Sequence, residues 1–441
     1  MLFKLHTHIF IVGILAFGIM ASMVMERAMS IMTLGAFFAF ITQQGLVLFF
    51  SQDNHTDYSE KTLFYTVLIY ISLLAVVLML ISLYYEGDTF MFSKTDAMLY
   101  FDACMKKIDM GLIKGFAIMM KNGSFDDWGA VVFDTFVMYI IPSKYFLNTI
   151  YTFFGAISAV FLYKIGKNFM PDSYAFLASL GYATSSYMVF FNCTFLKEPL
   201  FIFIVISAYY NLYNAISRQS AWSLFCAGFC LLLGVFFRPA VVAFIAMSIF
   251  TYYGITEWGK AISLFLIGIV LVILVVSFSF MQSAADAYTA GGDVDAIFAN
   301  NNSGSYSSTF NYFVSYYSAF FGPFPTLFSK SEEPSRLIFY GAGLMYKLFL
   351  IIPFWIGIFY SIKKKNIAMI PLAMFTLLEM ASTGYIYASL ELRKVLLHIP
   401  LTYIIAFYGL FQLFQSVKIP FAVEMSSFLI IVGMLMLWNV R

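Results

Sequence analysis

Long apolar runs follow one another along most of the chain, separated by short polar stretches. Each run approaches the ~20 residues that a helix needs to cross a bilayer. Because the runs are unbroken and do not alternate with period two, they exclude a transmembrane β-barrel. The runs predict thirteen membrane spans, at about 8–25, 31–51, 62–85, 145–163, 174–191, 198–216, 221–237, 239–256, 261–281, 337–361, 367–382, 395–415 and 421–438.

Two longer polar segments, 86–144 and 282–336, interrupt this pattern. Within the first, apolar residues gather on one side of 108–120, which predicts a helix lying in the membrane interface. Residues 131–141 are apolar but too short to span, which predicts a second interfacial or re-entrant helix. The second segment is rich in Ala, Asp, Gly, Asn, Ser and Tyr. It is predicted as a lid that orders over a ligand or, equally, as a hydrophilic connector.

Composition supports the same class. Of the 441 residues, 62% are hydrophobic and 11% are charged, whereas soluble domains carry about 25% charged residues. The sequence therefore predicts an all-α polytopic membrane protein. The net charge of +2 says nothing about nucleic acid, but no basic cluster interleaved with aromatics lies outside short loops, which argues against nucleic-acid binding. Neither the cysteines nor the histidines form a metal pattern, and a Cys104–Cys193 disulfide is a weak alternative.

The densest short basic loop, 363–365, sets the orientation. The positive-inside rule places it in the cytoplasm, together with the N-terminus. The first apolar run is then interpreted as a retained helix and not as a cleaved signal peptide. Both long polar segments face outward, and the protein is predicted to lie in the inner (cytoplasmic) membrane with its active site outside.

The predicted organisation has four parts. Residues 1–61 form an N-terminal helical pair, an addition to the core. Residues 62–281 form the transmembrane core, which carries the outer loop 86–144. The lid 282–336 and the C-terminal spans 337–441 complete the chain.

Ionisable residues gather at the outer ends of the predicted spans. Charges at such boundaries are costly and tend to be kept for use, although a single one is more often a snorkelling or topology-setting charge. Asp102 could simply solvate the loop, and Tyr100 could be an interface-belt aromatic. The candidate site residues are Asp96, Tyr100, Asp102, Lys197, Glu198, Arg238, Lys347, Arg393 and His398.

This set suits chemistry on a lipid-linked sugar. A carboxylate where a span meets water is a candidate general base for an acceptor hydroxyl, and Asp96 is interpreted as that base. A lipid phosphate lies at headgroup depth, where Arg and Lys bind it. A polyprenyl chain fits an apolar groove between helices.

Four motifs occur in one order along 86–415. The sequence here resembles the GT-C superfamily of integral-membrane glycosyltransferases, which includes protein O-mannosyltransferases and aminoarabinose transferases. It departs from the family at Lys394, where an aromatic or His is common, and in having three spans before the first motif. The motifs are Asp96-Ala97-x-x-Tyr100-x-x-Ala103, Asn192-x-x-x-x-Lys197-Glu198-Pro199-Leu200, Gly234-x-x-x-Arg238-Pro239, and Glu391-x-Arg393 followed by Pro400.

The resemblance implies roles for these residues. Asp96 would be the general base, and Glu198 a second carboxylate that orients a substrate or holds a divalent metal, as in metal-dependent relatives. Arg238, Lys347 and Arg393 would grip the phosphate that leaves. The donor would be a polyprenyl-phosphate sugar, the acceptor an envelope glycan, lipid or protein, and no cofactor is certain.

Two alternatives stay open. An O-antigen or exopolysaccharide polymerase would use a polyprenyl-diphosphate-linked oligosaccharide with the same outer arginines. A transporter or lipid flippase would instead need charges near the bilayer midplane and discontinuous helices. Lys347 and Glu379 are the candidates for such midplane charges.

Overall fold

The described part of the chain is helical throughout and has no strand. The predicted span 261–281, the lid up to residue 335, and Glu391 and Arg393 lie outside the described residues. The computed structural model describes residues 2–23, 31–52, 58–89, 96–122, 128–255, 336–366, 368–387, 396–416 and 428–435.

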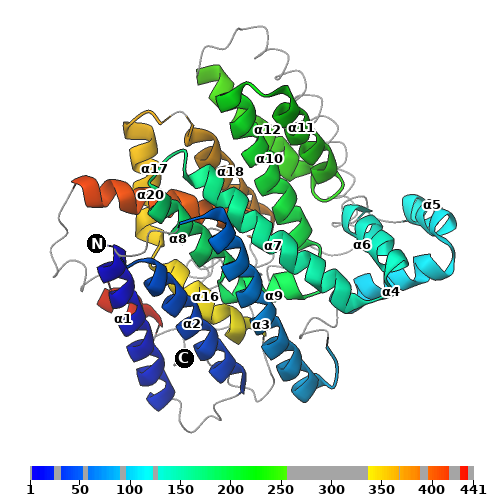
Figure 1. Ribbon diagram of the computed structural model, residues 1–441, viewed down its shortest axis with the longest axis horizontal. Coiled ribbons are helices and arrows are strands. Elements are labelled where there is room, and N and C mark those ends of the chain that lie inside the picture. The colour runs from blue at the N-terminus through cyan, green and yellow to red at the C-terminus, as the bar shows by residue number, and fades with distance from the viewer. Residues whose placement is uncertain are drawn as a thin grey trace.

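The helices follow the predicted apolar runs closely, and Figure 1 labels them in chain order. Residues 428–435 are also helical. The bounds are α1 Leu2–Met23, α2 Ile31–Phe50, α3 Glu60–Glu86, α4 Asp96–Asp109, α5 Leu112–Asn122, α6 Trp128–Ile140, α7 Lys144–Gly166, α8 Asp172–Ala183, α9 Ser186–Cys193, α10 Glu198–Arg218, α11 Ala221–Val235, α12 Pro239–Ile255, α16 Arg336–Leu348, α17 Ile351–Lys363, α18 Ile370–Tyr387 and α20 Ile399–Ser416.

Five helices among the described residues are long and apolar enough to cross a membrane, and six if the bent pair α16–α17 counts as one span. The membrane class and the all-helical fold expected from the sequence are therefore compatible with the structure. The count of thirteen spans stays a prediction, because α11, α12 and α18 are described as shorter apolar helices.

Three predicted segments are broken where the sequence suggested continuity. The run 174–191 divides into α8 and α9 at Thr184–Ser185. The run 337–361 bends by 46° between α16 and α17. The interfacial helix expected at 108–120 is split, because Gly111 has a positive φ of 83° and separates α4 from α5. A left-handed glycine commonly ends a helix, and hydropathy alone does not reveal such a break.

Helix ends show why these segments start and stop where they do. At the start of α3, the Ser59 side chain accepts a hydrogen bond from the Thr62 backbone N–H at 3.2 Å, a serine N-cap. At its end, Gly87 adopts φ +69° and its N–H donates to the carbonyl oxygen of Leu83. This terminus precedes the polar segment 86–144.

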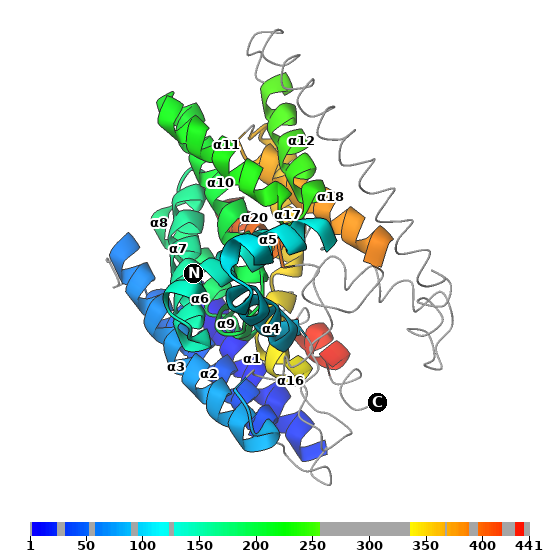
Figure 2. The same ribbon diagram turned by 90° about the vertical axis from the view of Figure 1, so that its right-hand side faces the viewer.

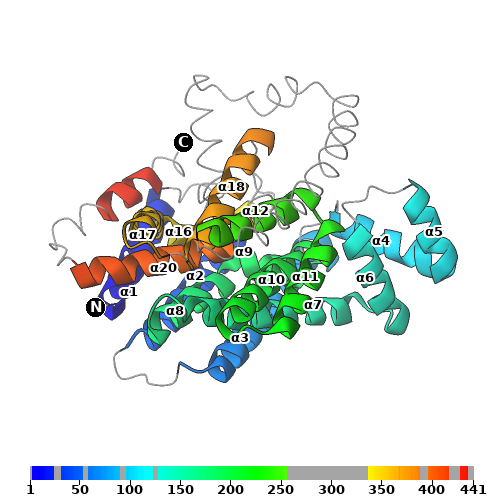
Figure 3. The ribbon, with the colours of Figure 1, turned by 90° about the horizontal axis from the view of Figure 1, so that it is seen from above.

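Helix α7 is central to the arrangement, because it packs against α3, α8 and α10. Figure 1 shows α1, α2 and α3 running side by side, with α10, α11 and α12 grouped beyond α7. Figures 1 and 3 show that α4, α5 and α6 form a separate group at one end of the molecule, and Figure 2 looks onto that end. These three helices are the outer segment that the sequence singled out.

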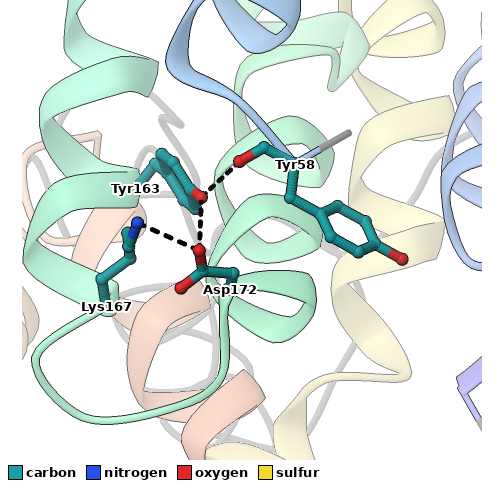
Figure 4. A network of polar contacts seen from close by, with 4 residues as sticks. All are labelled: Tyr58, Tyr163, Lys167 and Asp172. Atoms are coloured by element: carbon teal, nitrogen blue, oxygen red, sulfur yellow. Dashed lines mark hydrogen bonds and ion pairs between the residues drawn. The ribbon is translucent and has the colours of Figure 1, made fainter. Parts of the chain in front are cut away.

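Polar contacts hold the opposite end of α7, where Lys167 pairs with Asp172 of α8 at 3.0 Å (Figure 4). The Tyr163 hydroxyl donates to the Tyr58 carbonyl oxygen at 2.5 Å and lies 3.3 Å from the Asp172 carboxylate. Because the ion pair is partly exposed, it contributes only about 0–1 kcal/mol. Its effect is to fix how α8 leaves α7.

Candidate functional site

The Lys197-Glu198-Pro199 motif forms the turn into α10. Glu198 is the first residue of that helix and Pro199 the second, positions that favour a carboxylate and a proline, respectively. The turn is deeply buried, since Lys197 is 8% and Glu198 3% exposed. A carboxylate and an amine that are both removed from solvent can act on a ligand without competition from bulk water.

Helix α4 packs directly on this turn. The Phe101 ring of α4 meets the Phe195 ring edge-on, with centroids 5.8 Å apart. Asp96 is the first residue of α4, but the position of its side chain lies outside the described part. Tyr100 and Asp102 follow on α4, both half-buried. The structure therefore brings the helix that begins with Asp96 against the Lys197–Glu198 turn.

The turn between α11 and α12, residues 236–238, is called the Arg238 turn. It contacts both α10 and α6. The Phe237 and Phe201 rings stack with centroids 5.3 Å apart, which joins this turn to the first turn of α10. On the other side, the Gly129 N–H of α6 donates to the Phe236 carbonyl oxygen at 3.0 Å. A Cβ at Gly129 would lie 2.3 Å from the Phe237 ring, so only glycine allows this approach.

Arg238 also faces a buried acid. It is half-buried and interacts electrostatically with Glu379 of α18, which is 4% exposed. The sequence had flagged Glu379 only as a midplane charge. Its proximity to Arg238 instead ties α18 to the turn between α11 and α12.

One further acid near this region, Asp134 of α6, is not among the candidates that the sequence offers. It is 1% exposed, and its carboxylate accepts a hydrogen bond from the Tyr151 hydroxyl of α7. Tyr151 also interacts electrostatically with Glu198. Burial raises the pKa of Asp134 to about 8, although the hydrogen bond from Tyr151 acts in the opposite direction. The sequence does contain a signal for this site, because Asp134 is the only charged residue in the apolar run 131–141.

Lys347 and His398 are buried on other elements. Lys347 is 2% exposed in the last turn of α16, and His398 directly precedes α20. These two elements meet where the Tyr346 and Tyr403 rings lie 6.1 Å apart. The predicted set is thus distributed: the described contacts join the Lys197–Glu198 and Arg238 turns with α4, and they place Lys347 and His398 at α16 and α20. Arg393 lies outside the described residues.

Neutral polar side chains surround the α8–α9 break. Ser186 donates to the Phe339 carbonyl oxygen of α16 at 2.5 Å and accepts from the Gly343 N–H at 2.9 Å. The Tyr187 hydroxyl donates to that of Tyr403 at 3.1 Å. Such bonds satisfy polar groups where a spanning helix is interrupted. The break is therefore tied to α16, close to the bend into α17.

Two expectations about metals and cysteines can be compared with the structure. In the ranges described, no three His, Cys, Asp or Glu residues come together as a metal site, so a metal role for Glu198 stays a prediction. The weak disulfide alternative is wrong: Cys104 and Cys193 are free and separately buried. Cys104 faces the Val131 carbonyl oxygen of α6, whereas Cys193 faces that of Ile71 on α3.

Known proteins add no assignment. No model of a known protein family matches the chain, and no curated protein matches it either.

Proposed function

We propose that the protein is a membrane glycosyltransferase. It moves a sugar from a polyprenyl-phosphate carrier to an envelope glycan, lipid or protein acceptor, at the outer face of the cytoplasmic membrane. One observation carries this proposal: the buried Lys197–Glu198 turn lies where α4, α6 and the Arg238 turn meet. The segments that carry Lys197, Glu198 and Arg238 thereby pack against one another and against the helix that begins with Asp96. The motif resemblance to the GT-C superfamily supports the same chemistry.

The proposed reaction is an inverting displacement at the anomeric carbon. Asp96 takes the proton from the acceptor hydroxyl, and the resulting oxygen forms a bond to the anomeric carbon. The bond from that carbon to the phosphate oxygen breaks, and the phosphate leaves on its lipid. Arg238 and Lys197 stabilise the departing phosphate charge. Glu198, in its buried turn, orients the reacting groups.

The direct test is single-turnover sugar transfer by the purified protein in lipid nanodiscs. Radiolabelled polyprenyl-phosphate sugars serve as donors, and a membrane extract serves as the acceptor. We expect Glu198→Gln and Asp96→Asn to lower the transfer rate by about 10²–10⁴-fold, the usual contribution of a positioned acid or base. Expression and donor binding should stay near wild type.

Asp172→Asn provides the matched control. Asp172 also lies in the first turn of a helix, but at the opposite end of α7, where it pairs with Lys167. This variant should transfer sugar at the wild-type rate. Full activity of both Glu198→Gln and Asp96→Asn would remove the two carboxylates from the mechanism and the proposal with them.

A polymerase using a diphosphate-linked oligosaccharide would fit the same cations. The product distinguishes the two enzymes, because a transferase adds one sugar and a polymerase makes a ladder of repeats. Gel analysis of the labelled product from the same reactions measures the number of sugars added.

Transport is the second class, and one observation favours it. The α16–α17 span bends by 46° just after the buried Lys347, and the neighbouring α8–α9 run is broken. Discontinuous helices with a buried charge are typical of transporters. Flux of a labelled lipid-linked sugar across proteoliposomes, abolished by Lys347→Met but unchanged in Glu198→Gln, would support this class over the transferase.

A further inference from the structure

Asp134 has no role in the reaction proposed above, yet it is among the most buried acids in the described part of the chain. Its carboxyl group lies inside the protein at 1% exposure and accepts a hydrogen bond from Tyr151. A buried carboxyl group persists only when its partner and its protonation state offset the loss of solvation. For Asp134 that partner is the Tyr151 hydroxyl.

Contacts around Asp134 connect three parts of the proposed site. Phe133, next to it on α6, stacks on Tyr151 with centroids 6.4 Å apart and packs on Phe154 at 5.8 Å. The Cys104 thiol of α4 faces the Val131 carbonyl oxygen of α6 at 4.0 Å. Helix α6 therefore rests on α7 and supports α4, the helix that begins with Asp96.

Charged and titratable groups interact with Asp134, or with its partners Tyr151 and Cys104, from α4, α7 and α10. Tyr151 lies on α7. Glu198, which interacts electrostatically with Tyr151, lies on α10. Helix α4 contributes Cys104 and Lys107. Burial raises the pKa of Asp134 to about 8, so the group is mostly neutral at pH 7. Its ionisation would put a negative charge in a buried site beside Tyr151, with no cation in hydrogen-bond contact with Asp134 among the described residues.

We propose that Asp134 is a positioning residue for the transfer reaction. In its neutral form it ties α6 to α7 through Tyr151, and so holds α4 over the Lys197–Glu198 turn. When Asp134 gains a charge, the buried contact becomes unfavourable and α6 moves away together with α4. The effect on catalysis rests on the proposed function. The link between α6 and α7 through the Asp134–Tyr151 hydrogen bond does not depend on it.

Cys104 is a natural reporter of this movement. Burial, with a further contribution from Asp134, raises the pKa of its thiol to about 12. Maleimide reacts with the thiolate, so Cys104 stays unreactive while α4 is seated on α6. Replacing Cys193, Cys226 and Cys230 by alanine leaves this thiol as the single site of labelling.

Two substitutions at Asp134 distinguish the effect of its ionisation from the effect of its hydrogen bond to Tyr151. Asparagine keeps an oxygen that accepts the Tyr151 hydrogen bond and cannot ionise, whereas alanine removes the bond. We measure labelling by a membrane-impermeant maleimide from pH 6 to pH 9 in nanodiscs. Asp134→Ala should label at least tenfold faster than wild type at pH 7. Asp134→Asn should stay protected at pH 7 and should label at least threefold more slowly than wild type at pH 9.

Sugar transfer is measured on the same variants. The wild-type rate should fall above pH 8, and Asp134→Asn should retain activity there, a rescue that a purely structural role would not produce. Tyr151→Phe should behave like Asp134→Ala. Asp172→Ala, which removes an acid at the far end of α7, should leave Cys104 protected.

The two proposals fail in different ways. A protected Cys104 in Asp134→Ala, or equal labelling of wild type and Asp134→Asn at every pH, would overturn the tie. The expected labelling in a protein that transfers no sugar would overturn the proposed function and leave the tie of α6 to α7 in place.

Discussion

Individual acids in this protein differ in how they are stabilised. Glu198 occupies the first turn of α10, where the backbone N–H groups and the helix dipole favour a negative charge. Asp134 lies within α6, away from any helix terminus, and its partner is the Tyr151 hydroxyl. The same functional group is therefore placed at a helix start in one case and against a tyrosine hydroxyl in mid-helix in the other.

The raised pKa of Asp134 predicts a pH-dependent stability. Burial raises the pKa of Asp134 from its ordinary value of 3.8 to about 8 in the folded protein, so between these values the unfolded chain binds fewer protons than the folded one. The contribution of this group is present below pH 4 and is lost progressively as the pH rises toward 8. Thermal unfolding in detergent should show a larger loss of Tm from pH 5 to pH 8.5 in wild type than in Asp134→Asn. Parallel Tm curves for the two proteins would contradict this assignment.

Pairs of helices are held together by close backbone approach as well as by apolar side chains. Helices α17 and α20 cross at two glycines: a Cβ on Gly357 would lie 2.1 Å from the Ile405 carbonyl oxygen, and one on Gly409 would lie 2.0 Å from that of Pro353. Small residues let helices pack this closely in membranes. At the other end of the molecule, Gly129 allows α6 to reach the Arg238 turn in the same way.

This crossing predicts that Gly357→Ala destabilises the protein. The methyl group has no room beside a backbone atom, so the helices must separate, at a cost of about 1–3 kcal/mol or more. Gly228→Ala on α11 is the control, because a Cβ there meets nothing within 4 Å and alanine favours a helix. Unfolding by a denaturing detergent, followed by tryptophan fluorescence, should start earlier for Gly357→Ala only. Equal curves for the two variants would show that the crossing is not tightly packed.

The whole molecule places its outer-segment helices to one side. Helices α4, α5 and α6 stand together beyond one end of α7 (Figures 1 and 3), while the Lys167–Asp172 pair holds the other end (Figure 4). The positive-inside rule assigns the two ends to opposite sides of the membrane. Broad apolar faces, such as that of α3, stay exposed between them, as expected for helices that contact lipid.

This orientation predicts where added cysteines can be labelled in cells. Ile113 of α5 is 89% exposed and lies in the segment predicted to face outward, so Ile113→Cys should react with an impermeant maleimide in intact cells. Lys365→Cys, in the basic loop after α17, should react only after permeabilisation. The reverse pattern would invert the topology and place the proposed site in the cytoplasm.

The sequence by itself predicted a helical membrane protein and located two turns that carry charged residues, at Lys197–Glu198 and at Arg238. Apolar runs of bilayer length leave a chain no other way to satisfy its backbone in lipid, and motifs such as Lys197-Glu198-Pro199 are local. Only the tertiary structure decided which helices are broken and that α6 carries a buried acid against Tyr151. It also decided that α4 packs on Phe195 and the Arg238 turn on Phe201, on either side of Glu198 in the chain. These outcomes depend on close approaches between residues distant in the chain, which no local pattern of hydropathy records.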